Sequence, residues 1–200
     1  MDIREKMRSG ELYRSDDNSL VSEQVRLMEL QYDYNHTRPT ELERRAALMK
    51  EIFAEVGEDC WLEPPFHANW GSHTHLGQKV YANFNLTLVD DTDVFIGDNT
   101  MIGPNVTIAT AQHPISPALR ELAYQYNLPV RIGRNVWLGS GAVILPGVTI
   151  GDNSVIGAGS VVTKDIPANV VAVGVPCKVL RPIGPQDEEF YYKDRRIELK

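Results

Sequence analysis

Histidines are the residues of this 200-residue sequence whose chemistry is most open to interpretation, and four of the five lie between positions 67 and 113. His67, His73, His75 and His113 could supply the three imidazoles of a zinc site, and alternation along a strand would place His73 and His75 on one side. Because the ordinary pKa of histidine lies near neutrality, one of them could instead be a general base. Position alone also allows a structural histidine that only satisfies backbone carbonyls.

His113 differs from the others because it begins the longest interruption of a repeating pattern. The interruption runs from about residue 110 to residue 129 and contains Leu122, Tyr124 and Tyr126. Loops of this length are usually either functional or disordered, and three large anchors argue against disorder. We therefore expect an ordered functional loop with His113 at its root.

The repeat around this loop returns an aliphatic residue at every sixth position. It is clearest in IGRNVWLGSGAVILPGVTIGDNSVIGAGSV, residues 132–161. A six-residue step turns a helical position by about 240°, which spreads the aliphatics around a helix, and alternating strands would need apolar residues at every second position. The pattern instead predicts a parallel β-helix of three-sided coils, with glycine or another small residue at its tight corners. Its inward column places Ile132 over Ile150, Leu138 over Ile156, and Ile144 over Val162.

Residues 1–57 have a different composition and predict two helices before the coils. The first carries Val21, Val25, Met28 and Tyr32 at helical spacing. The second begins at a capping box, Thr40-Glu-Leu-Glu43, and ends before a capping glycine, Gly57. Its apolar face comprises Leu42, Ala46, Met49, Phe53 and Val56. The expected organisation is a helical segment over 1–57, a β-helix over 58–183 with the loop at about 110–129, and a tail over 184–200.

Composition limits the partners and the compartment. The net charge is −7, which argues against nucleic acid as a partner because no dense basic face is available. No apolar run approaches the roughly 20 residues of a membrane span, and the N-terminal residues do not resemble a signal peptide, so we expect a cytoplasmic protein. Cys60 and Cys177 have no metal-type spacing and are expected to be buried, inert thiols.

Several motifs resemble those of the galactoside and maltose O-acetyltransferases. They are Tyr81-Ala-Asn-Phe-Asn-Leu-Thr-Leu-Val-Asp-Asp91, His113-Pro, the segments 132–140 and 146–167, Gly174-Val-Pro-Cys-Lys178, Gly10-Glu-Leu-Tyr and Tyr34-Asn-His-Thr-Arg-Pro. The resemblance covers nearly the whole chain. It implies a left-handed β-helix, an exception to the right-handed rule for crossovers. It also implies a homotrimer that transfers acetyl directly from acetyl-CoA to a sugar hydroxyl, with no permanently bound cofactor and no metal.

The same resemblance assigns roles to individual residues. His113 becomes the general base, and Asn83 contacts both substrates. Acetyl-CoA is expected along Trp137, Ser140, Ala158, Thr163 and Lys164, with its phosphates at Lys178 and Arg181. The acceptor is expected at Asn69, Asn83 and Asp91, together with Asp16 or Asp17. Asn69 stands where the galactoside enzyme has serine, and Ser15 competes with the two aspartates for the N-terminal position.

Three other interpretations stay open at this point. The acceptor could be an antibiotic hydroxyl or an amine, because the donor groove would be the same. The chain could be a catalytically silent binding or scaffold protein. Hexapeptide-repeat carbonic anhydrases, which bind zinc through three histidines, offer the third interpretation.

Overall fold

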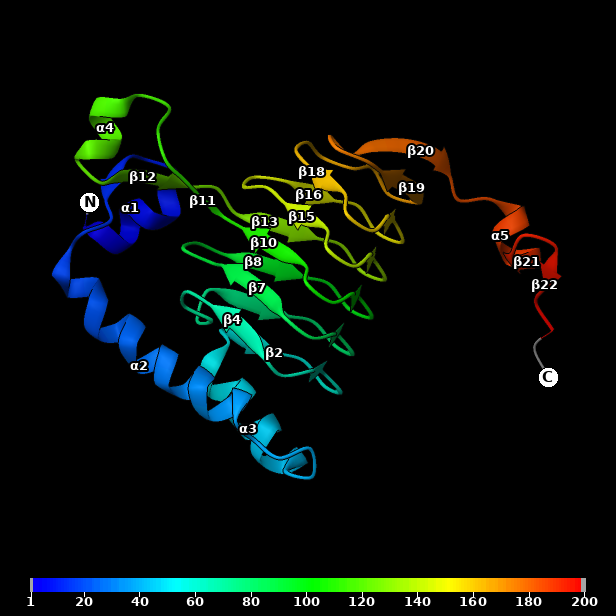
Figure 1. Ribbon diagram of the computed structural model, residues 1–200, viewed down its shortest axis with the longest axis horizontal. Coiled ribbons are helices and arrows are strands. Elements are labelled where there is room, and N and C mark those ends of the chain that lie inside the picture. The colour runs from blue at the N-terminus through cyan, green and yellow to red at the C-terminus, as the bar shows by residue number, and fades with distance from the viewer. Residues whose placement is uncertain (1, 199–200) are drawn as a thin grey trace.

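The computed structural model describes residues 2–198, and its centre is a parallel β-helix whose coils each have three faces (Figure 1). The first face consists of β2 (Glu55–Val56), β5 (Thr74–Leu76), β8 (Val94–Ile96), β13 (Val130–Ile132) and β16 (Thr149–Ile150). The second consists of β3 (Trp61–Leu62), β6 (Tyr81–Ala82), β9 (Met101–Ile102), β14 (Trp137–Leu138), β17 (Val155–Ile156), β19 (Val170–Val173) and β20 (Lys178–Pro182). The third consists of β4 (Phe66–Ala68), β7 (Leu86–Val89), β10 (Thr107–Ala109), β15 (Val143–Ile144) and β18 (Val161–Val162).

The chain visits the faces in the order first, second, third. Each coil therefore has three corners, which we name by the faces that they join: the 1/2 corner, the 2/3 corner and the 3/1 corner. The predicted inward column is confirmed, because Ile132 pairs with Ile150, Leu138 with Ile156, and Ile144 with Val162 in parallel register. All six side chains are buried. The first coil strand, β2, lies ahead of residue 58, where we expected the coils to begin.

The glycines that follow the aliphatic residues are required by the spacing of the coils. A Cβ on Gly139 would lie 2.5 Å from the backbone nitrogen of Ala158 in the next coil, closer than real Cβ atoms approach. The residue two positions after each of these repeat glycines has a left-handed backbone conformation, and that residue is often asparagine. Those asparagines also bond from coil to coil, as Asn135 Nδ2 does to Asn153 Oδ1 at 3.0 Å. Close stacking therefore selects glycine, and the turn selects asparagine.

Three helices precede the coils, where two were predicted: α1 (Ile3–Ser9), α2 (Asn18–Asn35) and α3 (Leu42–Ile52). The predicted apolar stripe of α2 was wrong. Its members, Val21, Val25, Met28 and Tyr32, are all exposed, whereas Leu20, Leu27 and Tyr34 are buried. Neighbouring residues on a helix differ by about 100°, and both sets have helical spacing, so the pattern did not say which set packs against the coils.

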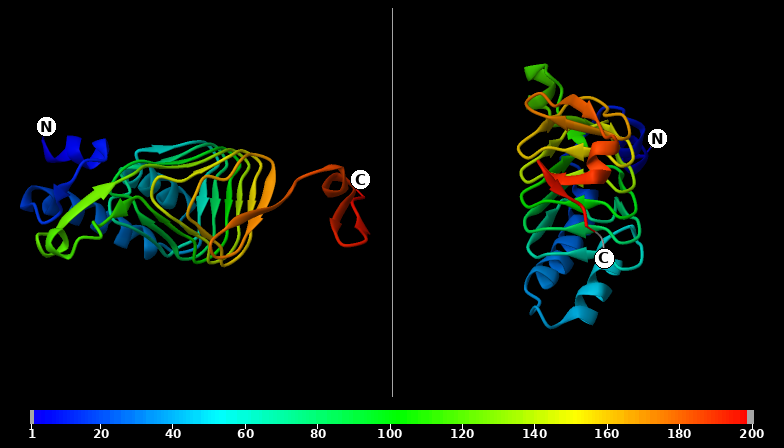
Figure 2. Two further views of the ribbon diagram at one scale, coloured as in Figure 1. Left: turned by 90° about the horizontal axis from the view of Figure 1, so that it is seen from above. Right: turned by 90° about the vertical axis from the view of Figure 1, so that its right-hand side faces the viewer.

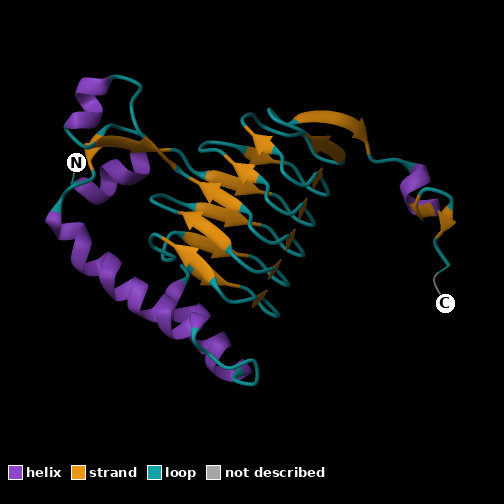
Figure 3. Ribbon diagram, viewed as in Figure 1, coloured by secondary structure: helices purple, strands orange, loops and turns teal. Residues whose placement is uncertain are grey.

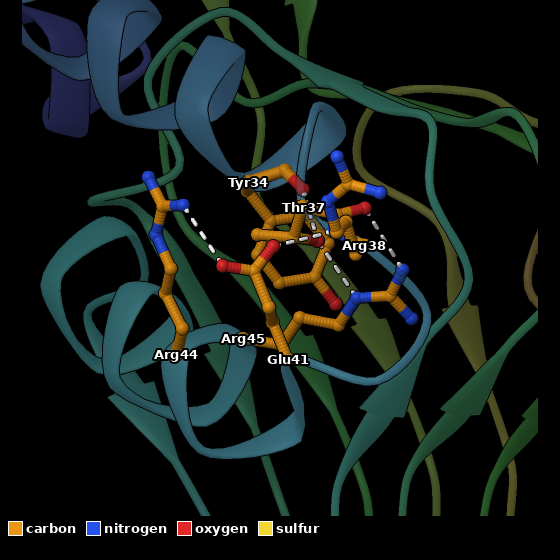
Figure 4. Close-up of polar contacts among 6 residues, drawn as sticks. All are labelled: Tyr34, Thr37, Arg38, Glu41, Arg44 and Arg45. Carbon is orange, nitrogen blue, oxygen red and sulfur yellow. Dashed lines mark hydrogen bonds and ion pairs between the residues drawn. The ribbon is translucent and has the colours of Figure 1, made fainter.

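The predicted limits of α3 were also wrong. Thr40 lies outside the cap; instead Glu41 accepts a hydrogen bond from the Arg38 backbone at 2.6 Å (Figure 4). The buried Arg45 then donates to Thr37 Oγ1 at 2.7 Å and closes the turn between α2 and α3. Gly57 follows β2 and donates its N–H to Leu76 O, so it belongs to the first coil. On the predicted apolar face, Met49 and Phe53 are buried, but Leu42 and Ala46 are exposed.

The long loop is ordered and leaves the coils at the 3/1 corner after β10. It contains β11 (Ala111–Gln112), α4 (Pro117–Glu121) and β12 (Tyr124–Asn127). β12 pairs with β11 and also with β1 (Tyr13–Arg14), which ties the loop to the N-terminal segment. The loop extends away from the coils, together with α1 (Figures 1 and 2).

The C-terminal residues form a separate arm beyond β20 (Figure 3). It consists of α5 (Pro185–Glu189), β21 (Phe190–Tyr192) and β22 (Arg195–Arg196), and the last two residues of the expected tail, 199–200, lie outside the described residues. No helix of the described chain is long and apolar enough to cross a bilayer. Cys177 is buried and Cys60 only partly buried, and burial raises the pKa of both free thiols.

Candidate active site

The 2/3 corner brings together three of the predicted donor residues. Asn83 follows β6, and Ser140 and Ala158 occupy the same corner in later coils. Gly159 N–H donates to Ser140 O at 2.8 Å, which stacks the two corners directly. Ser140 and Ala158 are exposed and small, so a chain-like ligand can lie close to the backbone along this corner.

The amide of Asn83 has a defined orientation. Its Oδ1 accepts a hydrogen bond from the Phe84 backbone at 2.7 Å, and its own backbone N–H donates to Ile102 O. The Oδ1 atom is therefore committed to the turn. Within residues 2–198 the Nδ2 group makes no hydrogen bond to protein, so its two N–H donors are available to a ligand.

The 3/1 corner brings together the predicted acceptor residues Asn69 and Asp91. Asn69 Nδ2 donates to Asp91 Oδ2 at 2.9 Å, and Gln125 Nε2 from β12 donates to Asp91 Oδ1 at 3.3 Å. Both carboxylate oxygens of Asp91 thus have a partner from a different element. This arrangement orients the carboxylate at the root of the loop.

A buried polar cluster below Asp91 was missed by sequence reasoning. Asn127 Nδ2 donates to Met7 O at 3.0 Å, to Tyr13 Oη at 3.0 Å and to Asp91 O at 3.2 Å. Burial raises the pKa of Tyr13, so its hydroxyl stays protonated. Gln125 and Asn127 lie on the same side of β12 because they are two residues apart. This strand-like spacing was the only signal in the sequence for the buried cluster.

The predicted anchors of the loop were wrong. Leu122 is exposed, and Tyr124 and Tyr126 are only half-buried, whereas Gln125 and Asn127 are buried. The loop strand turns its polar residues toward the body because backbone and side-chain acceptors there need donors. Apolar residues were expected to anchor the loop, but hydrogen bonds anchor it.

His113 follows β11 on the loop and is exposed to solvent. Its Nδ1 lies 3.1 Å from the carbonyl oxygen of Tyr124. A carbonyl can only accept a hydrogen bond, so this contact assigns the ring proton to Nδ1 and leaves a lone pair on Nε2. The contact also holds the ring, so the Tyr124 carbonyl is the group that orients His113.

The two N-terminal aspartates have different partners. Asp17 caps α2 by accepting from the Ser19 backbone at 2.8 Å, and hydrogen bonding from the Ser19 side chain and backbone lowers its pKa. Asp16 is exposed and paired with Arg14 at 2.7 and 3.1 Å, which lowers its pKa as well. Ser15 donates to Ala123 O in the loop at 3.1 Å. Asp16 is therefore the carboxylate of the two that helix capping does not occupy.

The remaining predicted donor residues line the outside of the later coils. Trp137 lies on the second face with its ring exposed, and Thr163 and Lys164 follow β18 at the 3/1 corner, also exposed. Lys178 and Arg181 lie on β20. Arg181 forms two hydrogen bonds of 2.7 Å with Asp187, and this pairing lowers the pKa of Asp187 to about 2. A phosphate that binds Arg181 must compete with Asp187.

The other histidines have partners of their own. His73 Nδ1 lies 2.8 Å from Asp90 O, and His75 lies between Glu55 and Asp93 at 3.6 and 3.3 Å. His67 is exposed on β4. Among residues 2–198, no three His, Cys, Asp or Glu side chains are grouped as a metal site requires.

The two halves of the predicted site lie at different corners of one chain. Asn83 occupies the 2/3 corner. Asp91 lies at the 3/1 corner, and the loop that carries His113 begins at that corner one coil later. The third face separates them, and its four-residue strand β7 spans roughly 13 Å. The loop leaves the coils after β10 and extends away from them (Figure 2), whereas Asn83 follows β6 at the other end of the third face.

Two family models match this chain. Residues 6–57 match the maltose acetyltransferase hexapeptide capping motif, and residues 129–164 match the bacterial transferase hexapeptide model of six repeats. The first match covers the end of α1 together with α2 and α3, and the second covers the most regular coils.

Whole-chain comparisons agree with the family models. Galactoside O-acetyltransferase of Escherichia coli K12 is 52% identical over 99% of this chain and 98% of its own length. The protein of that name from Lactococcus lactis is also 52% identical, over 97% and 94%. A structure of galactoside acetyltransferase with coenzyme A superposes with a TM-score of 0.96 at 52% identity, covering all of both chains.

A maltose O-acetyltransferase from Clostridium difficile 630 has a TM-score of 0.90 at 45% identity, over 92% of this chain and 98% of its own. Identity of this extent, together with the matched capping motif and repeats, shows common descent over nearly the full length. This chain therefore belongs to the hexapeptide-repeat acetyltransferases that carry the maltose acetyltransferase capping motif.

Proposed function

We propose that this acetyltransferase transfers acetyl from acetyl-CoA to a hydroxyl group of a small sugar of the galactoside, maltose or glucose type. The observation that carries the proposal is the contact between His113 Nδ1 and Tyr124 O, which in the neutral ring leaves Nε2 free to accept a proton. The 52% identical relatives named galactoside O-acetyltransferase support the choice of acceptor.

His113 acts as the general base. A sugar hydroxyl is a poor nucleophile at neutral pH, so Nε2 takes its proton while the oxygen attacks the thioester carbonyl. The C–O bond forms, and the carbonyl becomes a tetrahedral oxyanion. When the C–S bond breaks, the sulfur of CoA leaves and receives the proton from His113. The sugar ester and free CoA are the products.

Asn83 stabilises the oxyanion and positions both substrates. Its Oδ1 is held by the Phe84 backbone, so Nδ2 points its donors away from the turn. Preorganised donors of this kind act where negative charge develops and need no rearrangement during the reaction. A hydrogen bond from the Phe84 backbone to Oδ1 is also typical of an asparagine that only shapes a turn. In this site the bond has a further effect, because it orients the Nδ2 end of the amide.

Acetyl-CoA runs along the 2/3 corner past Ser140 and Ala158, with Trp137 beside it. The amides of pantetheine pair with exposed backbone groups between coils, as an added strand would. Thr163 and Lys164 lie at the 3/1 corner instead, so they do not line the 2/3 corner of the same chain. Lys178 and Arg181 bind the phosphates, and Arg181 exchanges Asp187 for phosphate when the donor arrives.

The acceptor binds at the 3/1 corner. Asp91 accepts hydrogen bonds from sugar hydroxyls, and Asn69 and Gln125 hold its carboxylate in place. Of the N-terminal pair, we assign Asp16 to the acceptor because Asp17 caps α2.

The working enzyme is a homotrimer with shared sites. Asn83 and His113 lie at different corners of one chain, so a complete site needs the Asn83 corner of one copy and the loop of another. Flat three-sided columns can pack around a threefold axis, and a cleft between two of them can exclude water from a thioester.

Mixed trimers test the shared site. Asn83→Ala and His113→Ala proteins should each be nearly inactive alone. In any mixed trimer, one interface joins an intact Asn83 to an intact His113, so about one third of its sites should recover. The two variants carry different tags, and tandem purification isolates the mixed trimers. Activity no higher than that of the parents in verified mixed trimers would place both residues in one chain.

Release of free thiol from acetyl-CoA tests the reaction itself. Galactosides, maltose and glucose are compared with an aminoglycoside and a hydroxyl-bearing antibiotic as acceptors. Sugar-dependent thiol release with an O-acetyl product supports the proposal. Acetylation of the antibiotic or the amine alone would refute the sugar assignment, and release with none of the acceptors would favour a binding protein.

A further inference from the structure

A pocket between the N-terminal helices and the coils has no role in the reaction proposed above. Its volume is about 290 Å³, and it lies between α1, the first turns of α2 and the turn that precedes β5. Arg4 and Arg8 line it from α1, Glu23 from α2, and Trp70, Ser72 and His73 from the turn.

Trp70, which lines this pocket, carries a buried donor that is unpaired within the described residues. The side chain is 4% exposed, yet its Nε1–H has no hydrogen-bond partner among residues 2–198. It is the only buried side-chain nitrogen or oxygen of that range without one. Leaving a buried N–H unpaired costs about 1–3 kcal/mol, so a ligand that reaches this atom from the pocket gains its hydrogen bond.

The charges around the pocket favour an anion. Arg4 pairs with Glu23 at 3.0 Å, so the charge of the one acidic side chain in the lining is neutralised. Arg8 forms no ion pair within residues 2–198, so the lining keeps one uncompensated guanidinium. The nearby Asp90 carboxyl does not oppose an anion strongly: it accepts from Trp70 N at 2.9 Å and Thr74 Oγ1 at 3.0 Å, and burial raises its pKa to about 7.

His73 adds a complementary acceptor. Its Nδ1 donates to Asp90 O at 2.8 Å, so Nε2 carries the lone pair. Burial lowers the pKa of His73, and the charge of Arg8 lowers it further, which keeps the ring neutral. An anion that also carries a hydroxyl proton satisfies this set, because it accepts from Trp70 and Arg8 and donates to His73.

We propose that this pocket binds hydrogen phosphate or a singly protonated phosphate monoester, held by Arg8, Trp70 Nε1 and His73. The ligand bridges α1 to the coils directly behind the acceptor corner. Trp70 follows Asn69 in the chain, and the α1 carbonyl of Met7 accepts from Asn127 below Asp91. Phosphate therefore stabilises the segment that supports Asp91.

Binding of inorganic phosphate to the intact protein tests the proposal. Isothermal titration, with chloride at matched ionic strength as the reference, should detect phosphate binding, and phosphate should raise the melting temperature. Arg8→Ala should weaken binding about tenfold or more, and Trp70→Phe, which keeps an aromatic ring but removes the N–H, roughly fivefold. Arg26→Ala is the matched control, because Arg26 is an exposed arginine of α2 outside the pocket. Glycerol phosphate, compared with inorganic phosphate, distinguishes a monoester from the free ion.

Three outcomes would overturn the proposal. They are no phosphate binding by the wild-type protein, equal weakening by Arg8→Ala and Arg26→Ala, and unchanged affinity in a Trp70→Phe protein that melts at the wild-type temperature. The proposal does not depend on the acetyl-transfer mechanism, since binding is measured without acetyl-CoA or acceptor.

Discussion

Replacing Asn127 with leucine removes the side chain that joins α1, β1 and the long loop below Asp91. The two N–H donors of the amide serve three oxygens at 3.0–3.2 Å, Met7 O, Tyr13 Oη and Asp91 O, so one hydrogen is shared between two of them. Leucine has a similar size but no hydrogen-bond donor. The backbone carbonyls of Met7 and Asp91 and the Tyr13 hydroxyl therefore each lose the donor that Asn127 supplies. At about 1–3 kcal/mol for each orphaned group, less the gain from burying a larger apolar side chain, we expect a loss of about 3 kcal/mol.

The expected loss converts to a measurable shift. For a chain of this size each kcal/mol lowers the melting temperature by about 2–4 °C, so Asn127→Leu should melt about 6–12 °C below the wild-type protein. Because Asp91 loses support and Asn83 does not, the KM of the acceptor should rise severalfold while the KM of acetyl-CoA changes by less than about twofold.

Differential scanning calorimetry and initial-rate kinetics measure the two effects. Gln78→Leu serves as the control, since it also replaces an amide with leucine but at an exposed position. A melting temperature within about 1 °C of wild type would refute the proposed role of the buried cluster. Equal increases in both KM values would show that the variant disturbs the site as a whole.

Three further predictions concern the site and its surroundings. His113→Ala should lower kcat at least about 10²-fold in steady-state assays with little change in acetyl-CoA affinity, and near-normal turnover by the folded variant would exclude His113 as the base. Replacing both Lys178 and Arg181 with alanine should weaken acetyl-CoA far more than a phosphate-free pantetheine thioester in competition assays; equal weakening would indicate a folding role. The pKa of Asp90 is raised in the folded state to about 7 from an ordinary 3.8, so the folded chain holds a proton that the unfolded chain releases. The stabilising contribution of this proton is full below pH 4 and is lost as the pH rises through 7. The melting temperature of Asp90→Asn minus that of the wild-type protein should therefore be larger at pH 8 than at pH 4. The same difference at both pH values would contradict the raised pKa.

Local regularity explains which elements were predictable. The six-residue period identified the coils and their register, because each aliphatic residue must meet its counterpart one coil away. The helices were less certain, since α2 has two sets of apolar residues with the same spacing and only contact with the coils distinguishes them. α1 has a single buried residue, Met7, and too short a pattern to recognise.

The candidate site divides in the same way. Residue types, loop position and family resemblance identified His113, Asn83, Asn69 and Asp91 as candidates. They did not identify Asn127, whose hydrogen bonds join elements that lie about 120 residues apart in sequence. They also did not reveal the pairing of Arg181 with Asp187, because nothing in the sequence pattern of an exposed arginine indicates its partner.

The repeat, the three-sided coil and the family can be read from the order of residues, because a six-residue period and long motifs are properties of that order. The folded chain was needed to show which nitrogen of His113 contacts Tyr124 O, which end of the Asn83 amide is available, and which corner each residue occupies. These features depend on hydrogen bonds and distances between segments that are remote in the chain. The physical reason is that a period fixes contacts between neighbouring coils, whereas the direction of a side chain depends on whichever groups the fold brings beside it.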